Sequence, residues 1–175
     1  MKPALLAIVG RKGSGKSEVL ATLIKLLTEK GVRVGVMKHL AREDFEIDQP
    51  GKDTHQYRLE GAETVMLLGR KKRAIFSDLQ LDSDWEENLS YFEGFDLVFL
   101  EGYFLKTVQT LEVYHQETGA PLLTDMNNIF AVCSDTLTAI SAPHFSPSTN
   151  HLEELVLLIQ SKLLLVHTDG KGVIL

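Results

Sequence analysis

A phosphate-binding loop near the start of the chain constrains the fold more than any other stretch. An apolar run at residues 5–9 has the length of a buried strand and leads into Gly-Arg-Lys-Gly-Ser-Gly-Lys-Ser at residues 10–17. A helical repeat of apolar residues begins directly afterwards, at Val19. The order of strand, Gly-x-x-x-x-Gly-Lys-Ser and helix is the context in which this motif binds polyphosphates, and it disfavours an accidental glycine-rich turn. We therefore predict an α/β protein with a three-layer P-loop NTPase fold, in which helices flank a mostly parallel central sheet.

Each residue type in this loop has a predicted role in holding a triphosphate. Glycines let the backbone turn so that successive N–H groups point into one concavity, at the positive end of the following helix. Lys16 is predicted to contact the β- and γ-phosphates as a catalytic cation, and the Ser17 hydroxyl to bind Mg²⁺. The predicted nucleotide-binding residues are Gly10, Arg11, Lys12, Gly13, Ser14, Gly15, Lys16, Ser17 and Glu18.

A second informative stretch is the continuous apolar run at residues 95–100, which ends in Glu101. The pattern predicts a buried central strand that carries a carboxylate to the C-terminal edge of the sheet. In P-loop proteins this position holds Mg²⁺ or its water, so Glu101 is predicted to bind the metal with Ser17. Another strand is predicted at residues 32–37, and Lys38 and His39 follow it. Because ligands bind beyond the carboxyl ends of parallel strands, we expect these two residues to face the nucleotide or a second substrate.

The loop at residues 40–53 combines many charges with Pro-Gly and lacks a clear period. A loop of this length is usually functional or disordered. Asp48, Lys52 and Asp53 are predicted to reach the metal and phosphates, either as general bases or through a water or ligand of the metal, as switch loops do in nucleotide-hydrolysing proteins. The alternative is a solvated charged loop without a chemical role.

The remaining elements follow from apolar period and capping signals. A short helix at 54–60 is predicted to be capped by Asp53 or Thr54, and a final helix to be capped by Asn150. Residues 83–86, which include Trp85, have the form of a capping box. An amphipathic helix is therefore predicted to begin there and to extend to residue 92. Further strands are expected at 63–68, 74–76, 110–114 and 129–133, a loop at 141–149, and a closing strand or loose tail at 164–175.

Composition narrows the class of protein. A chain of 175 residues suits one domain, and we expect a single nucleotide-binding domain over residues 1–175. The formal net charge of −6 argues against a surface that binds nucleic acid by general electrostatics. The single cysteine, Cys133, cannot form an internal disulfide, which fits a reducing cytosol. Without an apolar run near the ~20 residues of a membrane span, a soluble cytoplasmic protein is expected.

Several companions of the phosphate loop are missing from the chain. No Asn-Lys-x-Asp is present to read guanine, and no Asp-x-x-Gly follows the second motif, which disfavours a Ras-like GTPase. An Arg-rich lid of the kind found in small-metabolite kinases is also missing, although the basic run at residues 71–73 is a candidate for a reduced version. The residues alone therefore leave the base preference and the acceptor open.

Five motifs in order together resemble the MobB family, the adaptors of molybdopterin-guanine dinucleotide biosynthesis. They are Gly-Arg-Lys-Gly-Ser-Gly-Lys-Ser at 10–17, Val-Met-Lys-His at 36–39, Asp-Gln-Pro-Gly-Lys-Asp-Thr at 48–54, Glu-Gly-Ala at 60–62 and Leu-Val-Phe-Leu-Glu-Gly-Tyr at 97–103. The resemblance implies GTP binding with Mg²⁺, weak GTP hydrolysis, a homodimer and association with the guanylyltransferase MobA, with molybdopterin as a candidate ligand. It also implies that Asp48 lies near the γ-phosphate as a candidate metal ligand, and that Asp135 contacts the base.

The chain departs from the family pattern at several basic positions. The second His that usually follows Lys-His is replaced by the stretch at residues 40–43, Phe104 stands where the family often has Lys, and Thr110 and His115 stand at the ends of a strand usually flanked by Lys and Arg. These changes leave the predicted nucleotide site intact. They remove cations that could bind a second, anionic ligand or contact a partner protein.

Three hypotheses follow. The first is a GTP-binding adaptor with slow turnover, and the second is a P-loop small-metabolite kinase or ligase that uses Asp48 or Glu101 as its base. The third is a degenerate P-loop scaffold that acts through protein contacts alone.

Overall fold

The computed structural model describes residues 2–40, 48–77, 85–115, 121–136 and 141–164. These residues belong to two compact units, one formed by Met1–His39 with Tyr91–Leu175 and the other by Leu40–Ser90. The expected single domain over residues 1–175 stays a prediction.

The first unit is built on a six-stranded sheet with the order β2-β5-β1-β6-β7-β8. The strands are β1 (Ala4–Val9), β2 (Val34–Lys38), β5 (Leu97–Glu101), β6 (Thr110–Val113), β7 (Ile129–Cys133) and β8 (His144–Phe145). All neighbouring pairs are parallel, so the strands' carboxyl ends meet at one edge of the sheet. This architecture confirms the predicted α/β fold with its mostly parallel central sheet.

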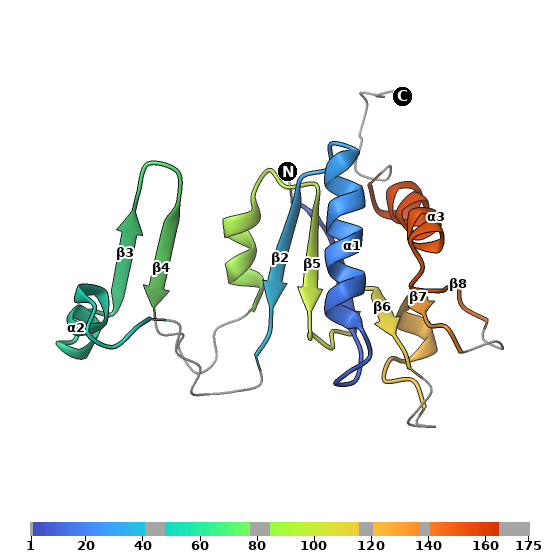
Figure 1. Ribbon diagram of the computed structural model, residues 1–175, viewed down its shortest axis with the longest axis horizontal. Helices are drawn as coiled ribbons and strands as arrows, with labels where there is room; N and C mark the ends of the chain where they lie inside the picture. Colours follow the sequence, from blue (N-terminus) through green and yellow to red (C-terminus); the bar gives the residue numbers. More distant parts are fainter. Residues whose placement is uncertain (1, 41–47, 78–84, 116–120, 137–140, 165–175) are drawn as a thin grey trace. The chain divides into compact units, whose positions relative to one another are not determined.

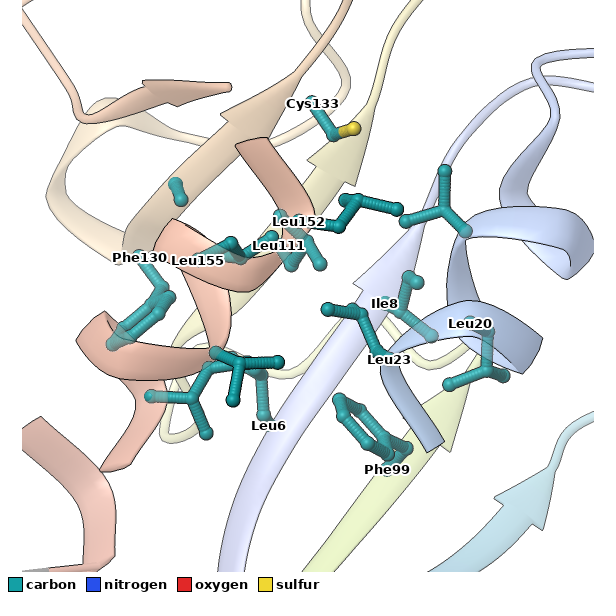
Figure 2. Packing of buried hydrophobic residues seen from close by; sticks show 14 of the residues in the cluster. Leu6, Ile8, Leu20, Leu23, Phe99, Leu111, Phe130, Cys133, Leu152 and Leu155 are labelled. Carbon is teal, nitrogen blue, oxygen red and sulfur yellow. The ribbon is translucent and has the colours of Figure 1, made fainter. Parts of the chain in front are cut away.

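Two helices cover one face of this sheet (Figure 1). They are α1 (Lys16–Glu29) and α3 (Thr149–Ile159), which continues into a short π-helical turn, η4 (Gln160–Leu164). Fully buried side chains of both helices, such as Leu23 and Leu155, pack with Leu6 and Phe99 of the sheet in one cluster, seen from close by in Figure 2. On the opposite face, the ring of Phe92 lies against Gly35 and Val98, so the sheet has packed side chains on both faces.

Helix α1 ends at a glycine in the left-handed conformation. Gly31 has φ +80°, a conformation that glycine adopts without strain. The N–H of Lys30 donates to Leu27 O at 3.1 Å, and the N–H of Val32 donates to the same carbonyl at 3.1 Å. These bonds satisfy a carbonyl of the last turn and direct the chain into β2.

The second unit contains a short helix, α2 (Asp53–Leu59), and the antiparallel strands β3 (Thr64–Leu68) and β4 (Arg73–Ser77). The two strands form a sheet of their own. The 3₁₀ helix η1 (Trp85–Phe92) occupies the segment for which an amphipathic helix is predicted, and the predicted capping residues 83–84 lie outside the described residues. Two shorter predictions, Asp53 or Thr54 as the cap of α2 and Asn150 as the cap of the last helix, are wrong.

The observed caps explain these corrections. Lys52 precedes α2 in an extended conformation, while the Thr54 hydroxyl is buried and donates to Asp48 Oδ1 at 2.8 Å, so it does not cap the helix. Ser148 precedes α3, and its carbonyl accepts the N–H of Leu152 at 3.0 Å.

Two further predictions concern the end of the chain. The segment 141–149, which is predicted to be a loop, contains the two-residue strand β8, paired with β7. A strand of two residues is too short to show an apolar or alternating pattern in the sequence. The predicted closing strand or tail lies almost entirely outside the described residues. Within the part of the chain that the structure describes, no helix combines the length and apolar character needed to cross a membrane.

Candidate functional site

The phosphate loop joins β1 to α1 and is shaped by left-handed glycines. Gly13 has φ +82° and Gly15 has φ +80°, and Gly15 is the N-cap of α1. The Gly15 carbonyl accepts the N–H groups of Glu18 and Val19 at 3.1 and 3.0 Å. Gly15 has no side chain with which to cap the helix, so the first N–H groups of α1 are available to an anion.

Gly10 is needed for a different reason, which is close packing. A Cβ atom at this position would lie 2.5 Å from Ser14 Oγ and 2.5 Å from the carbonyl oxygen of Val113 in β6. Both distances are far below van der Waals contact. The absence of a side chain therefore allows the loop to pack directly against the neighbouring strand.

Lys16 and Ser17 occupy the first turn of α1. The Lys16 ammonium lies 3.4 Å from the Gly10 carbonyl oxygen, so the side chain folds back over the loop toward the position that a phosphate would take. Both residues line a cavity of about 510 Å³ at the carboxyl edge of the sheet. Its other lining residues are Arg11, Lys12, Gly13, Ser14, Gly15, Glu18, Lys38, His39, Glu101 and Gly102.

Glu101 is the last residue of β5 and is 8% exposed. Its Oε1 lies 3.2 Å from the ammonium of Lys38, the residue paired with it in the register of β2 and β5. Carboxylate and hydroxyl oxygens are the donors that Mg²⁺ prefers, and Glu101 and Ser17 supply both kinds to one cavity. The cation beside Glu101 shows that this carboxylate accepts positive charge, so the two residues fit the predicted metal.

The donor set is small, as expected for magnesium. No group of three or more His, Cys, Asp or Glu with metal-binding geometry occurs among the described residues. Mg²⁺ in nucleotide sites is usually held by one or two protein groups together with waters and substrate phosphates. The structure thus brings together the two predicted ligands Ser17 and Glu101, while a metal role for Asp48 stays a prediction.

Asp48 belongs to the second unit, where its carboxylate organises the turn before α2. It is 7% exposed, and Oδ1 accepts the Thr54 hydroxyl at 2.8 Å and the Gln49 N–H at 3.0 Å. The solvated environment that the alternative assumes does not apply to Asp48 itself, whereas the presence or absence of a chemical role for the loop stays a prediction. Its predicted roles as a general base and near the γ-phosphate stay predictions.

Asp135 lies just beyond the end of β7 and lines a second cavity of about 330 Å³. Gly13, Ser14 and Gly15 of the phosphate loop also line this cavity, together with Val19, Thr22 and His115 among others. A molecule that bound phosphate at the loop would therefore have a continuation on the β7 side of α1. This placement is consistent with the predicted contact of Asp135 with a base.

Glu112 is a site residue that the sequence did not indicate. It lies in the middle of β6, is 1% exposed, and its two carboxylate oxygens accept the N–H groups of Leu123 at 2.8 Å and Thr124 at 2.9 Å. Arg11 also donates to the carbonyl of Pro121 at 3.3 Å. The segment 121–124 is thus tied both to β6 and to the phosphate loop. Arg11 and Glu112 also line a smaller cavity of about 230 Å³, together with Lys12 and His115 among others.

Two groups near the sheet edge have shifted acidity. Burial raises the pKa of Tyr103, whose ring centroid lies 5.2 Å from that of His39 at a tilt of 55°. Burial, and secondarily the charge of Asp135, raises the pKa of the Cys133 thiol to about 12. Cys133 is therefore a protonated core residue, as its apolar surroundings predict.

The parallel sheet, the phosphate loop at the start of α1 and the strand-end carboxylate define a protein of the P-loop NTPase-like α/β class. The family model for molybdopterin guanine dinucleotide synthesis protein B, MobB, matches residues 5–135. The chain belongs to the MobB family, which confirms the resemblance seen in the sequence motifs.

Individual relatives agree with this assignment. The molybdopterin-guanine dinucleotide biosynthesis adapter protein of Escherichia coli is 28% identical over 138 residues, which cover 75% of this chain and 78% of that protein. The protein with the same description from Haemophilus influenzae is 30% identical over 120 residues, covering 67% of each chain.

Solved structures show the same fold. The crystal structure of Bacillus subtilis MobB superposes with a TM-score of 0.73 at 21% identity, covering 96% of this chain and 99% of that one. A MobB homologue from Bacillus stearothermophilus gives a TM-score of 0.67 at 19% identity, with 90% and 99% covered.

Proposed function

We propose that this chain is a cytoplasmic adaptor of molybdopterin-guanine dinucleotide biosynthesis that binds GTP with Mg²⁺, hydrolyses it slowly and assists a MobA-type guanylyltransferase. The observation that carries the proposal is the single cavity into which the phosphate loop, Ser17 and Glu101 all open. The part played in biosynthesis is supported by the description of the family and of its relatives in Escherichia coli and Haemophilus influenzae.

The cavity suits a triphosphate by charge as well as by shape. Arg11, Lys12, Lys16 and Lys38 line it with positive charge, and the N-terminus of α1 adds its partial positive charge. Mg²⁺, held by Ser17 and Glu101, would neutralise the phosphate oxygens as it does in P-loop proteins generally. The cations and the loop N–H groups would orient the phosphates and hold them in place.

Slow turnover is proposed because the residues that line the cavity supply charges for the phosphates and the metal, while the sequence shows no evident acceptor site. Fixed cations that bind the substrate and the transition state equally well increase affinity without raising the rate constant for chemistry. Such a site is suited to a protein that uses the bound nucleotide to change its partner contacts. We therefore expect hydrolysis far below the roughly 1–100 s⁻¹ of kinases.

We propose that Asp135 gives the site its preference for GTP over ATP. A carboxylate accepts hydrogen bonds, and guanine presents its N2 amino group as a donor where adenine has none. Asp135 lines the cavity that continues from the phosphate loop, at the end of a strand two positions from β1 in the sheet. A base placed there would lie against Val19 and Thr22 of α1, which line the same cavity.

Partner contacts are proposed for the second unit. Met66 and Leu68 lie on one face of β3 and are 53% and 78% exposed, and exposed apolar groups of this kind often mark protein interaction sites. We propose that the homodimer and the guanylyltransferase draw on this surface. The small cavity beside Arg11, Lys12 and His115 is our candidate for the anionic part of molybdopterin.

Competition titration tests the nucleotide site. We expect GTP·Mg²⁺ to displace a fluorescent guanine nucleotide at lower concentration than ATP·Mg²⁺, and Lys16→Ala to weaken both by about tenfold or more, since charge-assisted bonds to phosphate are lost. Asp135→Asn should remove the preference for GTP while leaving the ATP affinity unchanged. Fast phosphoryl transfer to a small acceptor would refute the adaptor and favour a kinase, whereas binding that survives Lys16→Ala unchanged would favour the scaffold.

Reconstitution tests the biological role. The purified guanylyltransferase should form the dinucleotide cofactor faster, or to a higher yield, when this protein and GTP are added. Equal rates with the wild-type protein and with Lys16→Ala would contradict the proposal that nucleotide binding supports the partner.

A further inference from the structure

The ion pair between Lys38 and Glu101 joins the ends of β2 and β5 inside the cavity of the phosphate loop. The two residues are partners in the parallel register, and Lys38 Nζ lies 3.2 Å from Glu101 Oε1. Their side chains differ strongly in exposure, at 53% for Lys38 and 10% for Glu101. One partner of the pair is therefore fixed in the protein, while the other has access to solvent.

This asymmetry has an electrostatic consequence. A carboxylate that is nearly removed from water is costly unless a cation or hydrogen-bond donor accompanies it. Glu101 is held at the strand end, where its carbonyl accepts the N–H of His39 at 2.9 Å. The Lys38 ammonium sits on a flexible four-carbon stem, so it supplies the counter-charge and is free to withdraw.

The same carboxylate is the proposed ligand of the metal. Ser17, Glu101 and Lys38 line one cavity with Lys16. A divalent cation and an ammonium repel each other by several kcal/mol at a contact distance of about 4 Å, even at the effective dielectric constant of about 20 that applies near a protein surface. Both cannot occupy the Glu101 carboxylate together, so metal binding requires Lys38 to leave it.

We propose that Lys38 is an exchangeable counter-ion, which pairs with Glu101 in the metal-free protein and moves to the phosphate oxygens when a metal–triphosphate enters. The inference rests on the proposed function, since it assumes that the cavity receives that ligand. This exchange would couple the binding of the metal to the binding of the triphosphate. Metal alone must displace Lys38 without compensation, whereas metal with a triphosphate offers the ammonium a new anionic partner.

A second ion pair of the chain provides a matched control. Lys25 and Glu29 lie one turn apart on α1, with Nζ to Oε1 at 4.0 Å and side chains 74% and 59% exposed. Exposed pairs of this kind contribute little, and this one lies outside the cavity. Lys25→Met removes the same charge from the same type of pair without touching the proposed site.

Mn²⁺ titration without nucleotide, followed by the electron paramagnetic resonance signal of the free ion, tests the exchange. We expect Lys38→Met to bind Mn²⁺ at least about fivefold more tightly than wild type, the lower end of typical couplings. The same variant should bind the Mg²⁺ complex of a GTP analogue about tenfold more weakly, because a charged hydrogen bond to phosphate is lost. Lys38→Arg, which keeps the charge, should stay close to wild type in its Mn²⁺ affinity, and Lys25→Met should match wild type in both titrations.

A double-mutant cycle identifies Glu101 as the shared partner. Glu101→Gln should weaken Mn²⁺ binding, and adding Lys38→Met to it should give no further gain in affinity. Equal Mn²⁺ affinity in wild type and Lys38→Met would overturn the exchange even if the nucleotide binds well. Failure of the wild-type protein to bind any triphosphate would instead refute the proposed function, so the two failures are distinguishable.

Discussion

Replacing Gly10 by alanine tests whether the packing of the phosphate loop against β6 controls ligand binding. The new Cβ would lie 2.5 Å from the Val113 carbonyl oxygen and from Ser14 Oγ, and such contacts essentially never fall below 3.0 Å. The side chain of Ser14 can rotate, but the backbone carbonyl cannot, so the loop must move by about 0.5 Å, the difference between these two distances. Overpacking of this kind costs about 1–3 kcal/mol of stability.

Such a displacement also misplaces the N–H groups that face the phosphates. In catalysis a misplacement of about 1 Å can lower the rate by a factor of roughly 10². On the same scale, we expect half that distance to weaken GTP·Mg²⁺ binding by about tenfold. Isothermal titration calorimetry measures the affinity, and urea denaturation gives the loss of stability on the same samples.

Gly31→Ala separates this steric effect from the general cost of substituting a glycine. Gly31 has φ +80° and nothing within 4 Å of its Cβ position, so alanine there is strained by about 1–2 kcal/mol without crowding. It should lower the stability and leave the nucleotide affinity at its wild-type value. Wild-type affinity in Gly10→Ala, measured on folded protein, would refute the argument that contact with β6 sets the loop geometry.

Two further predictions concern buried acidic groups. In Glu112→Gln only one side-chain oxygen remains to accept the N–H groups of Leu123 and Thr124, and the new amide group faces one of them as a second donor. The free energy of unfolding measured in urea should therefore fall by about 1–3 kcal/mol. An unchanged urea midpoint would contradict this prediction. The raised pKa of Cys133, about 12 against an ordinary value of 9.0, means that the unfolded chain loses the thiol proton first as pH rises. Wild type should therefore lose stability relative to Cys133→Ala by about 1.4 kcal/mol per pH unit above about pH 9, and parallel stability curves from pH 8 to 10 would disprove it.

The sequence predicted those parts of the site that depend on contiguous residues. The phosphate loop, its flanking strand and helix, and the strand-end Glu101 follow from local patterns, because each pattern has a backbone or periodic cause. The cavity shared by Ser17 and Glu101 was predicted too, since the ends of parallel strands and the loop at the first strand meet at one edge.

Glu112 shows where that reasoning stops. It lies in an alternating segment that reads as an ordinary strand, yet it is buried and holds two backbone N–H groups. Only the position of β6 between β1 and β7, with the segment 121–124 folded over it, creates these partners. The pattern of apolar residues along the chain indicates which side chains are buried. It does not indicate which backbone N–H groups of a distant segment will need an acceptor.

Helix caps failed for a related reason. Thr54 has the residue type of a cap, but its hydroxyl is taken by the buried carboxylate of Asp48. Hydrogen-bonding side chains compete for several backbone and side-chain partners, and the tertiary environment selects among them.

By itself, the sequence determined that a Gly-x-x-x-x-Gly-Lys-Ser loop joins a strand of an α/β sheet to a helix, because the glycine positions and the apolar periods on either side are local properties. Only the tertiary structure placed Lys38 on Glu101, 3.2 Å apart, although 62 other residues separate them in the printed sequence. The cause is the parallel pairing of β2 with β5, which puts an exposed cation and a buried carboxylate side by side at the edge where the ligand is expected.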